Sequence, residues 1–163
     1  MFEKFGEMDS YKEINDLAEA MFNEGDLESI KILAEENGIP EYADLYISGD
    51  IPYLCDAESA AMGKLEVESK SLKMKGLMLD WLEYIRGLCM ENDLIAHQVR
   101  KKDKSLKECL AKLLIYSFQN RITVDPKIIK AAKISASRVD FGIPGMGEAK
   151  KLIREYDLGG TGK

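Results

Sequence analysis

The spacing of apolar residues predicts helices along most of this chain. Leu17, Ala18 and Met21 follow Ser10 at helical intervals, and Ser10 with Glu13 has the spacing of a capping box. The expected helices of the first half cover residues 10–24, 26–37, 40–48 and a stretch from about 52 into the 60s. The first three open on a capping residue or a proline and end beside a glycine, as helices commonly do.

The second half continues in the same way. Its cleanest amphipathic stripe lies in residues 76–91, and a short helix capped by Asp93 should follow to about residue 100. Ser105 and Glu108 have the spacing of a second capping box, and further helices are expected over residues 127–133 and 148–156. We expect the core of this half to contain Leu82, Ile85, Cys109, Leu113 and Leu114. No run as long as a strand alternates between apolar and polar residues. The predicted fold class is therefore all-α, a multi-helix bundle.

Charge is divided unevenly along the chain. Residues 1–68 carry 18 acidic and 4 basic side chains, whereas residues 69–163 carry 11 acidic and 19 basic ones. The positive excess is concentrated in residues 100–138, where 11 basic side chains face 3 acidic ones. With a polar stretch at residues 67–75, this predicts an acidic helical module over 1–68, a hinge, and a basic helical module over 69–163 with a disordered tail from about 158. Two solvated helical faces would show the same division of charge.

Composition narrows the class of protein. Hydrophobic residues make up 45% of the 163 positions and charged residues 32%, as in a globular protein, and no apolar run reaches the ~20 residues that span a bilayer. The first residues lack the features of a signal peptide, so we expect a cytoplasmic protein with no membrane contact. Three cysteines without C-x-x-C spacing and a single histidine, His97, favour neither disulfides nor a metal site. We expect no catalytic residues, no metal and no cofactor.

Three groups of residues are candidate binding sites. The strongest is a basic cluster around Ser105, where positive charge meets the positive end of a helix dipole and therefore favours an external anion; its members are Arg100, Lys101, Lys102, Lys104 and Lys107, with Lys127 and Lys130 on a later helix. A second group, Gly145, Gly147 and Lys150, has some features of a phosphate-contacting hairpin, although a simple turn needs the same glycines. The third is an acidic surface, Glu35, Glu36, Glu41 and Asp44, which could imitate nucleic acid.

Residues 81–132 resemble the PcfK-like family of small proteins from conjugative plasmids and phages. The resemblance rests on Trp81-Leu82-Glu83, on Asp93-Leu94-Ile95-Ala96, and on Lys104-Ser105-Leu106-Lys107-Glu108-Cys109 followed by apolar Leu110, Leu113 and Leu114. Some members of that family are similar to anti-CRISPR proteins that block type II RNA-guided nucleases. The resemblance therefore implies a mobile-element protein, and a nuclease inhibitor among its possible functions.

These observations lead to three expectations for function. The first is a non-enzymatic inhibitor that binds a bacterial RNA-guided nuclease, or its guide RNA or DNA, through either the basic cluster or the acidic surface. The second is a DNA-binding accessory protein of a plasmid or phage. The third is a structural partner in conjugation or phage assembly that forms a homo-oligomer.

Overall fold

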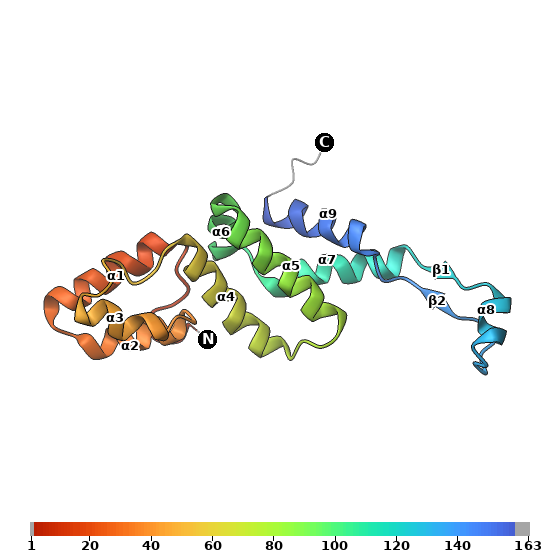
Figure 1. Cartoon of the computed structure of the whole chain (residues 1–163), viewed down its shortest axis with the longest axis horizontal. Helices are drawn as coiled ribbons and strands as arrows, with labels where there is room; N and C mark the ends of the chain where they lie inside the picture. The colour runs from red at the N-terminus through yellow and green to blue at the C-terminus, as the bar shows by residue number, and fades with distance from the viewer. Residues whose placement is uncertain (1, 159–163) are drawn as a thin grey trace. The chain divides into compact units, whose positions relative to one another are not determined.

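The computed structural model describes residues 2–158, in which nine helices and two very short strands follow one another along the chain (Figure 1). The predicted all-α class is therefore confirmed. By its internal contacts the chain divides into two units, residues 1–107 and 108–163. None of the helices in residues 2–158 combines the length and the apolar composition needed to cross a membrane.

Six helices build the first unit. They are α1 (Tyr11–Glu24), α2 (Leu27–Glu36), α3 (Glu41–Ser48), α4 (Ala57–Leu72), α5 (Leu77–Glu91) and α6 (Asp93–Arg100). The capping residues set several of their first turns: the Ser10 hydroxyl accepts from the Glu13 N–H, and the Asp26 carboxylate accepts from the Ser29 N–H. Two expected starts were wrong, because α4 begins after Asp56 rather than at Pro52, and the cap of α6 is Asn92 rather than Asp93.

Two groups of buried side chains hold this unit together. In the first, α1 packs on α2 and α2 on α3, around the apolar residues Ile14, Ala18, Met21, Ile30, Leu33, Ala34, Ile39, Ala43, Leu54, Cys55 and Ala60. In the second, α4 packs against both α5 and α6, which bury Trp81, Leu82, Ile85, Leu88, Cys89, Ile95, Ala96 and Val99. Because α4 contributes Ala60 to the first group and packs along the second, it joins them.

Two glycines allow α4 to approach the end of α2. A Cβ atom built on Gly63 would lie 2.2 Å from the carbonyl oxygen of Asn37, and one built on Gly38 would lie 2.3 Å from the carbonyl oxygen of Gly63. Any side chain at either position would therefore collide with backbone. Gly63 sits in the middle of a helix, where glycine usually weakens the structure, so its place here follows from this close backbone contact.

The expected hinge at residues 67–75 lies partly inside α4, which is unbroken to Leu72. The expected boundary at 68/69 is thus replaced by one after Lys107. The polar pattern was misleading because Glu68, within the expected hinge, is buried on this helix and accepts a hydrogen bond from the Leu106 N–H. A buried polar residue whose partner is distant in sequence cannot be told from an exposed one by local pattern, so such a stretch of helix resembles a linker.

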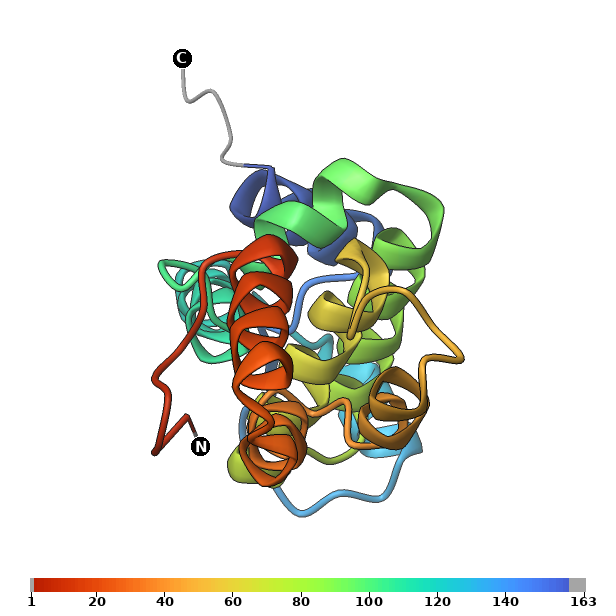
Figure 2. The ribbon, with the colours of Figure 1, turned by 90° about the vertical axis from the view of Figure 1, so that its left-hand side faces the viewer.

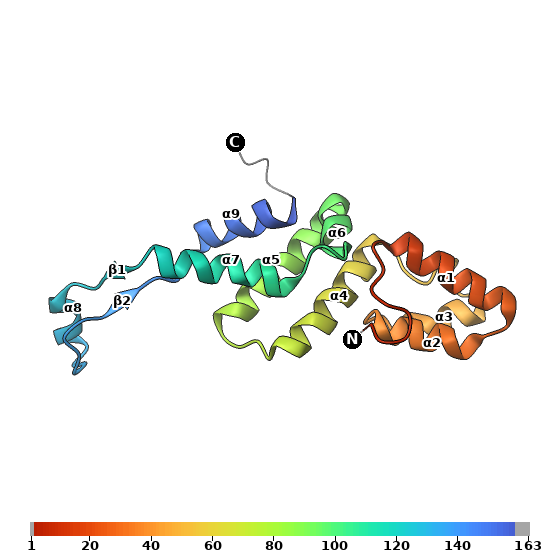
Figure 3. The ribbon, with the colours of Figure 1, turned by 180° about the vertical axis from the view of Figure 1, so that it is seen from behind.

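The second unit contains most of α7 (Leu106–Gln119), then β1 (Ile122–Thr123), α8 (Pro126–Ala131), β2 (Asp140–Phe141) and α9 (Met146–Asp157). The strands pair antiparallel, Ile122 with Phe141 and Thr123 with Asp140, and α8 lies in the connection between them (Figure 3). Tyr156 of α9 donates its hydroxyl hydrogen to the Glu108 carboxylate of α7 at 3.1 Å. These strands were not expected, because two residues are too few to show an alternating pattern.

The apolar stripe expected on α7 is only partly buried. Leu106, Cys109 and Leu113 are buried, as expected for core residues, but Leu114 and Phe118 are 58% and 63% exposed. The prediction that Leu114 belongs to the core was therefore wrong. Helical spacing places the buried face of a helix only to within about one residue. Leu114 lies at the edge of the buried face of α7, which is why the spacing alone assigned it to the core.

Candidate anion-binding segment

Arg100 is not on the surface with the lysines that follow it. Its side chain is 1% exposed at the end of α6, where it donates to the Asn37 amide oxygen at 2.6 Å, and its guanidinium lies 5.7 Å from the centre of the Phe2 ring. Burial lowers the pKa of this guanidinium, while the nearby Glu7 carboxylate acts in the opposite direction. Arg100 must be removed from the predicted surface cluster, because its role is to join α6 to the end of α2.

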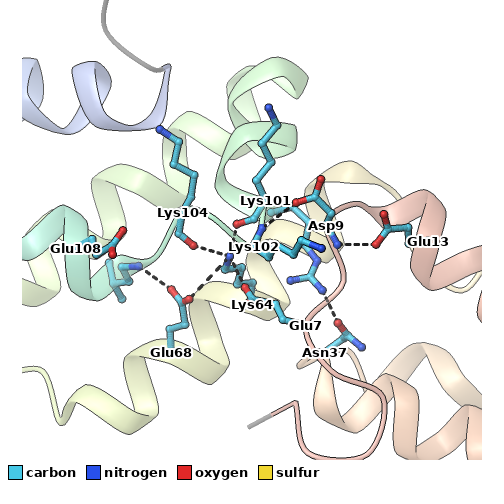
Figure 4. Close-up of polar contacts among 12 residues, drawn as sticks. Glu7, Asp9, Glu13, Asn37, Lys64, Glu68, Lys101, Lys102, Lys104 and Glu108 are labelled. Atoms are coloured by element: carbon cyan, nitrogen blue, oxygen red, sulfur yellow. Dashed lines mark hydrogen bonds and ion pairs between the residues drawn. The ribbon is translucent and has the colours of Figure 1, made fainter.

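The remaining lysines follow Arg100 in residues 101–107, called the basic segment below. A buried lysine on α4 holds this segment from inside (Figure 4). Lys64 is 1% exposed, and its Nζ donates to the carbonyl oxygens of Lys101 at 2.5 Å and Lys104 at 2.7 Å. The same ammonium forms an ion pair with the Glu7 carboxylate at 2.6 Å. A buried ammonium requires such partners, and here two of them are backbone atoms of the basic segment.

Two carboxylates fix the backbone N–H groups of the basic segment. Glu68, one turn after Lys64 on α4, accepts from the Leu106 N–H at 2.7 Å, and Asp9 accepts from the Lys102 N–H at 3.1 Å. Burial raises the pKa of the Glu68 carboxyl, against the lowering effects of the Leu106 N–H and the Lys64 charge. Within the segment, the Lys104 N–H also donates to the Lys101 carbonyl oxygen.

Through these hydrogen bonds the main chain of the basic segment faces α4. Lys102 and Lys107 are exposed and Lys101 and Lys104 are half-buried, and the ammonium ends of Lys101 and Lys104 point away from Lys64 in Figure 4. Four lysines thus lie within seven residues on a backbone that is fixed at both ends. Such an arrangement concentrates positive charge without requiring the segment to fold when it binds.

The other predicted basic residues belong to the second unit. Lys127 and Lys130 are exposed on α8, and Lys133, just after it, is also exposed and has a left-handed backbone with φ of 55°. Because α8 has only six residues between two short strands, these lysines form a small basic patch of their own.

The predicted phosphate-contacting hairpin has a different geometry. Gly145 precedes the first residue of α9 and has φ of −59°, while Gly147 is the second residue of that helix. Neither glycine has a positive φ, and a Cβ atom at either position would meet nothing within 4 Å. The backbone therefore does not require glycine at these positions, and the helix expected over 148–156 begins two residues earlier, at Met146. Lys150 is exposed on α9.

The acidic residues are engaged within the first unit to different degrees. Glu36 accepts from the backbone N–H groups of Glu3, Lys4 and Phe5, so it ties the N-terminal segment to α2. Asp44 pairs with Lys31 at 2.8 Å, whereas Glu35 and Glu41 are exposed. Neutralising Glu36 would therefore disturb structure as well as charge.

The three cysteines and the single histidine lie wholly or partly inside the molecule. Cys55, Cys89 and Cys109 are all buried, and burial raises the pKa of the Cys55 thiol to about 12. His97 is half-buried, with its ring centre 5.2 Å from that of Tyr11. Within residues 2–158, no group of three histidine, cysteine or acidic side chains is arranged to hold a metal ion.

Sequence reasoning missed all three residues that support the basic segment, which are Lys64, Glu68 and Asp9. Lys64 and Glu68 are one helical turn apart, and Lys64 lies beside the buried Leu65 on α4. Both also continue the helical spacing of the buried Ala60 and Ala61. That spacing was the available signal, since charged residues within a buried stripe are rare unless they are paired.

Comparison with known proteins provides no further guide. No family model, no curated protein and no solved structure matches this chain.

Proposed function

We propose that this chain is a non-enzymatic binding protein that uses Lys101, Lys102, Lys104 and Lys107 to contact the phosphates of a nucleic acid or an acidic protein surface. The observation that carries the proposal is the inward anchoring of the segment's backbone by Lys64, Glu68 and Asp9. A buried ammonium bound to two carbonyl oxygens is costly to assemble, and its effect here is to fix the position of four clustered lysines.

Within this proposal, the partner is a nucleic-acid-handling effector of a bacterial cell. The resemblance of residues 81–132 to PcfK-like proteins supports a type II RNA-guided nuclease, with the protein acting as a mobile-element inhibitor. In such an effector both the guide RNA and the DNA present phosphate, and lysines held close together can compete for or bind to it.

A second candidate is a DNA-binding accessory protein. The observation that favours it is the exposed basic patch of Lys127, Lys130 and Lys133 in the connection between β1 and β2, which is separate from the basic segment. Phosphate contacts by such lysines would be independent of base sequence.

The test is recovery of partners from a bacterial lysate, with and without nuclease treatment, using the natural chain and a variant with Lys101, Lys102, Lys104 and Lys107 all changed to Glu. Recovery of an RNA-guided nuclease by the natural chain alone is the expected result. Recovery of DNA by both the natural chain and this variant, lost on nuclease treatment, would favour the accessory protein instead. Recovery of only further copies of the chain would contradict both and leave the homo-oligomer.

A further inference from the structure

A groove on the first unit lies along α1. It has a volume of about 750 Å³, within the range of ligand-binding clefts, and it is lined by α1, the end of α3 and residues 49–53. These parts can be followed in Figure 2 by colour, red for α1 and orange to gold for α3 and the residues after it. Nothing in the basic segment contributes to this groove.

One wall is a stripe of α1 side chains at helical spacing. Tyr11, Asn15, Glu19 and Phe22 follow one another at intervals of three or four residues and line the groove together. The buried residues of the same helix, Ile14, Ala18 and Met21, belong to the core instead. Phe22 is 43% exposed, so the helix presents an aromatic side chain on a face that its core packing does not require.

The side of the groove formed by the end of α3 and the residues after it is also aromatic. The ring of Tyr46 meets that of Phe22 edge-on with 5.8 Å between their centres, and Tyr53 is 68% exposed at the rim beside Pro52. A tyrosine that keeps two thirds of its surface in water, next to other aromatic rings, is available for contact with a partner.

The walls are held in place by polar contacts behind them. The Asn15 amide donates to the Cys55 carbonyl oxygen at 2.8 Å and accepts from the Cys55 N–H at 3.0 Å, which attaches the segment after α3 to α1. The Ser48 hydroxyl donates to the Asp50 carboxylate at 2.6 Å and secures the turn at Gly49. The groove therefore exists before any ligand arrives, and binding need not order it.

The charge of the groove is negative. Asp16 and Glu19 provide two exposed carboxylates, against the single ammonium of Lys12. Burial raises the pKa of the Tyr46 hydroxyl, and the Glu19 charge acts in the same direction. Phosphate would be repelled here, because the first 68 residues carry 18 acidic side chains against 4 basic ones.

We infer that this groove binds an arginine side chain, presented by a flexible segment of a partner protein. A guanidinium stacks on tyrosine and phenylalanine rings and pairs with carboxylates, so it satisfies both kinds of side chain that line the groove. Lysine would satisfy the carboxylates but stack less well. This site is independent of the proposed contact between the basic segment and an anion, and either can fail without the other.

The test is a titration of the full chain, followed by the backbone amide signals in two-dimensional NMR. The probe is a short glycine peptide with two arginines, and the matched control peptide has citrulline in place of arginine, which keeps the shape and removes the charge. We expect shifts concentrated in residues 11–23 and 46–53 with the arginine peptide. Equal shifts with the citrulline peptide, or shifts spread over all acidic surfaces, would overturn the inference.

Two variants make the test specific to the groove. Asp16→Asn with Glu19→Gln should weaken binding by about tenfold or more, since it removes both carboxylates, and Tyr53→Ala should also weaken it. Glu24→Gln with Glu91→Gln removes the same charge from exposed positions outside the groove and should leave binding almost unchanged. Equal losses in the two double variants would show a long-range charge effect and contradict the site. Shifts that depend on protein concentration without any peptide would assign the groove to a second copy of the chain and overturn the choice of partner.

Discussion

At the scale of single residues, the feature that distinguishes this protein is a set of buried charges beneath an exposed cluster of lysines. Lys64 and Arg100 are almost completely buried, and each is bound to a residue more than 35 positions away in sequence. Buried charges of this kind contribute little net stability compared with apolar residues, but removing one partner leaves the others unpaired. Their value here lies in fixing the positions of the elements that they join.

Replacing Lys64 with Met should therefore be strongly destabilising. The change leaves Glu7 and two carbonyl oxygens of the basic segment without their donor, which should lower the free energy of unfolding by about 3–5 kcal/mol. Lys70→Met is the matched control on the same helix, because Lys70 is exposed and its ion pair with Glu66 should contribute at most about 1 kcal/mol. Urea unfolding of both variants measures the difference, and similar losses would mean that Lys64 does not hold the segment.

Glu68 should give the protein a specific dependence on pH. Burial raises the pKa of this carboxyl above its ordinary 4.5, so between that value and the raised pKa the folded state keeps a proton that the unfolded state releases. Its contribution to stability is thus present below pH 4.5 and is lost as the pH rises through that interval. Glu68→Gln stays neutral and keeps an acceptor for the Leu106 N–H, so its stability relative to the natural chain should increase with pH. Unfolding free energies measured across the interval test this, and a constant difference would contradict it.

At the scale of elements, the helices were largely predictable because their determinants are local. Ser10 and Asp26 cap the helices expected to begin at them, and Gly25 and Gly49 end theirs in the left-handed conformation. Two expected helix starts were wrong by a few residues or fewer, but the larger failure, the expected hinge, involves a partner that the local sequence does not contain. Residues 67–75 were predicted to be a hinge because they are polar and lie where the charge changes sign, and the partner that Glu68 finds in Leu106 lies 38 residues later.

The two faces of α7 can be compared directly. Leu113→Ala should lower the free energy of unfolding by about 2–5 kcal/mol, because the side chain is fully buried. Leu114→Ala should cost much less than its neighbour, since 58% of Leu114 is exposed and its truncation leaves no closed cavity. Thermal or urea unfolding of the two variants measures the difference. A larger loss of unfolding free energy for Leu114→Ala than for Leu113→Ala would mean that the buried face of α7 is wrongly placed.

Replacing a glycine with alanine should have opposite effects on stability at two helical positions, one in the close contact between α2 and α4 and one in open space on α5. Gly63→Ala should destabilise by about 1–3 kcal/mol, because the added methyl group would meet the Asn37 carbonyl oxygen. Gly87→Ala, in the middle of α5 with open space around its Cβ position, should stabilise by up to about 1 kcal/mol. Denaturant midpoints measure both. If Gly63→Ala also stabilises the chain, the two backbones are farther apart than described.

At the scale of the whole molecule, the division of charge was visible in the sequence but the division of structure was not. The net charge is −10 for residues 1–107 and +4 for residues 108–163, a weaker contrast than the one between the expected modules. The basic segment lies at the end of the acidic unit, so its lysines carry positive charge into an otherwise negative unit. Four of the five residues predicted for this cluster remain candidates, and Arg100 does not, because a run of basic residues gives no sign of which side chain turns inward.

The central claim is that the basic segment binds phosphate through lysines whose backbone is already fixed. The most direct measurement is the affinity for a short labelled DNA duplex as a function of salt concentration, for the natural chain and for the variant with Lys101, Lys102, Lys104 and Lys107 changed to Glu. The variant should bind far more weakly, and in the natural chain the logarithm of the binding constant should fall with the logarithm of salt concentration, with a slope of about −0.9 for each phosphate contact. Circular dichroism should show the same helix content in both proteins, since these lysine side chains lie outside the buried groups of the fold. Equal affinity and an equal salt slope in both proteins would contradict the account.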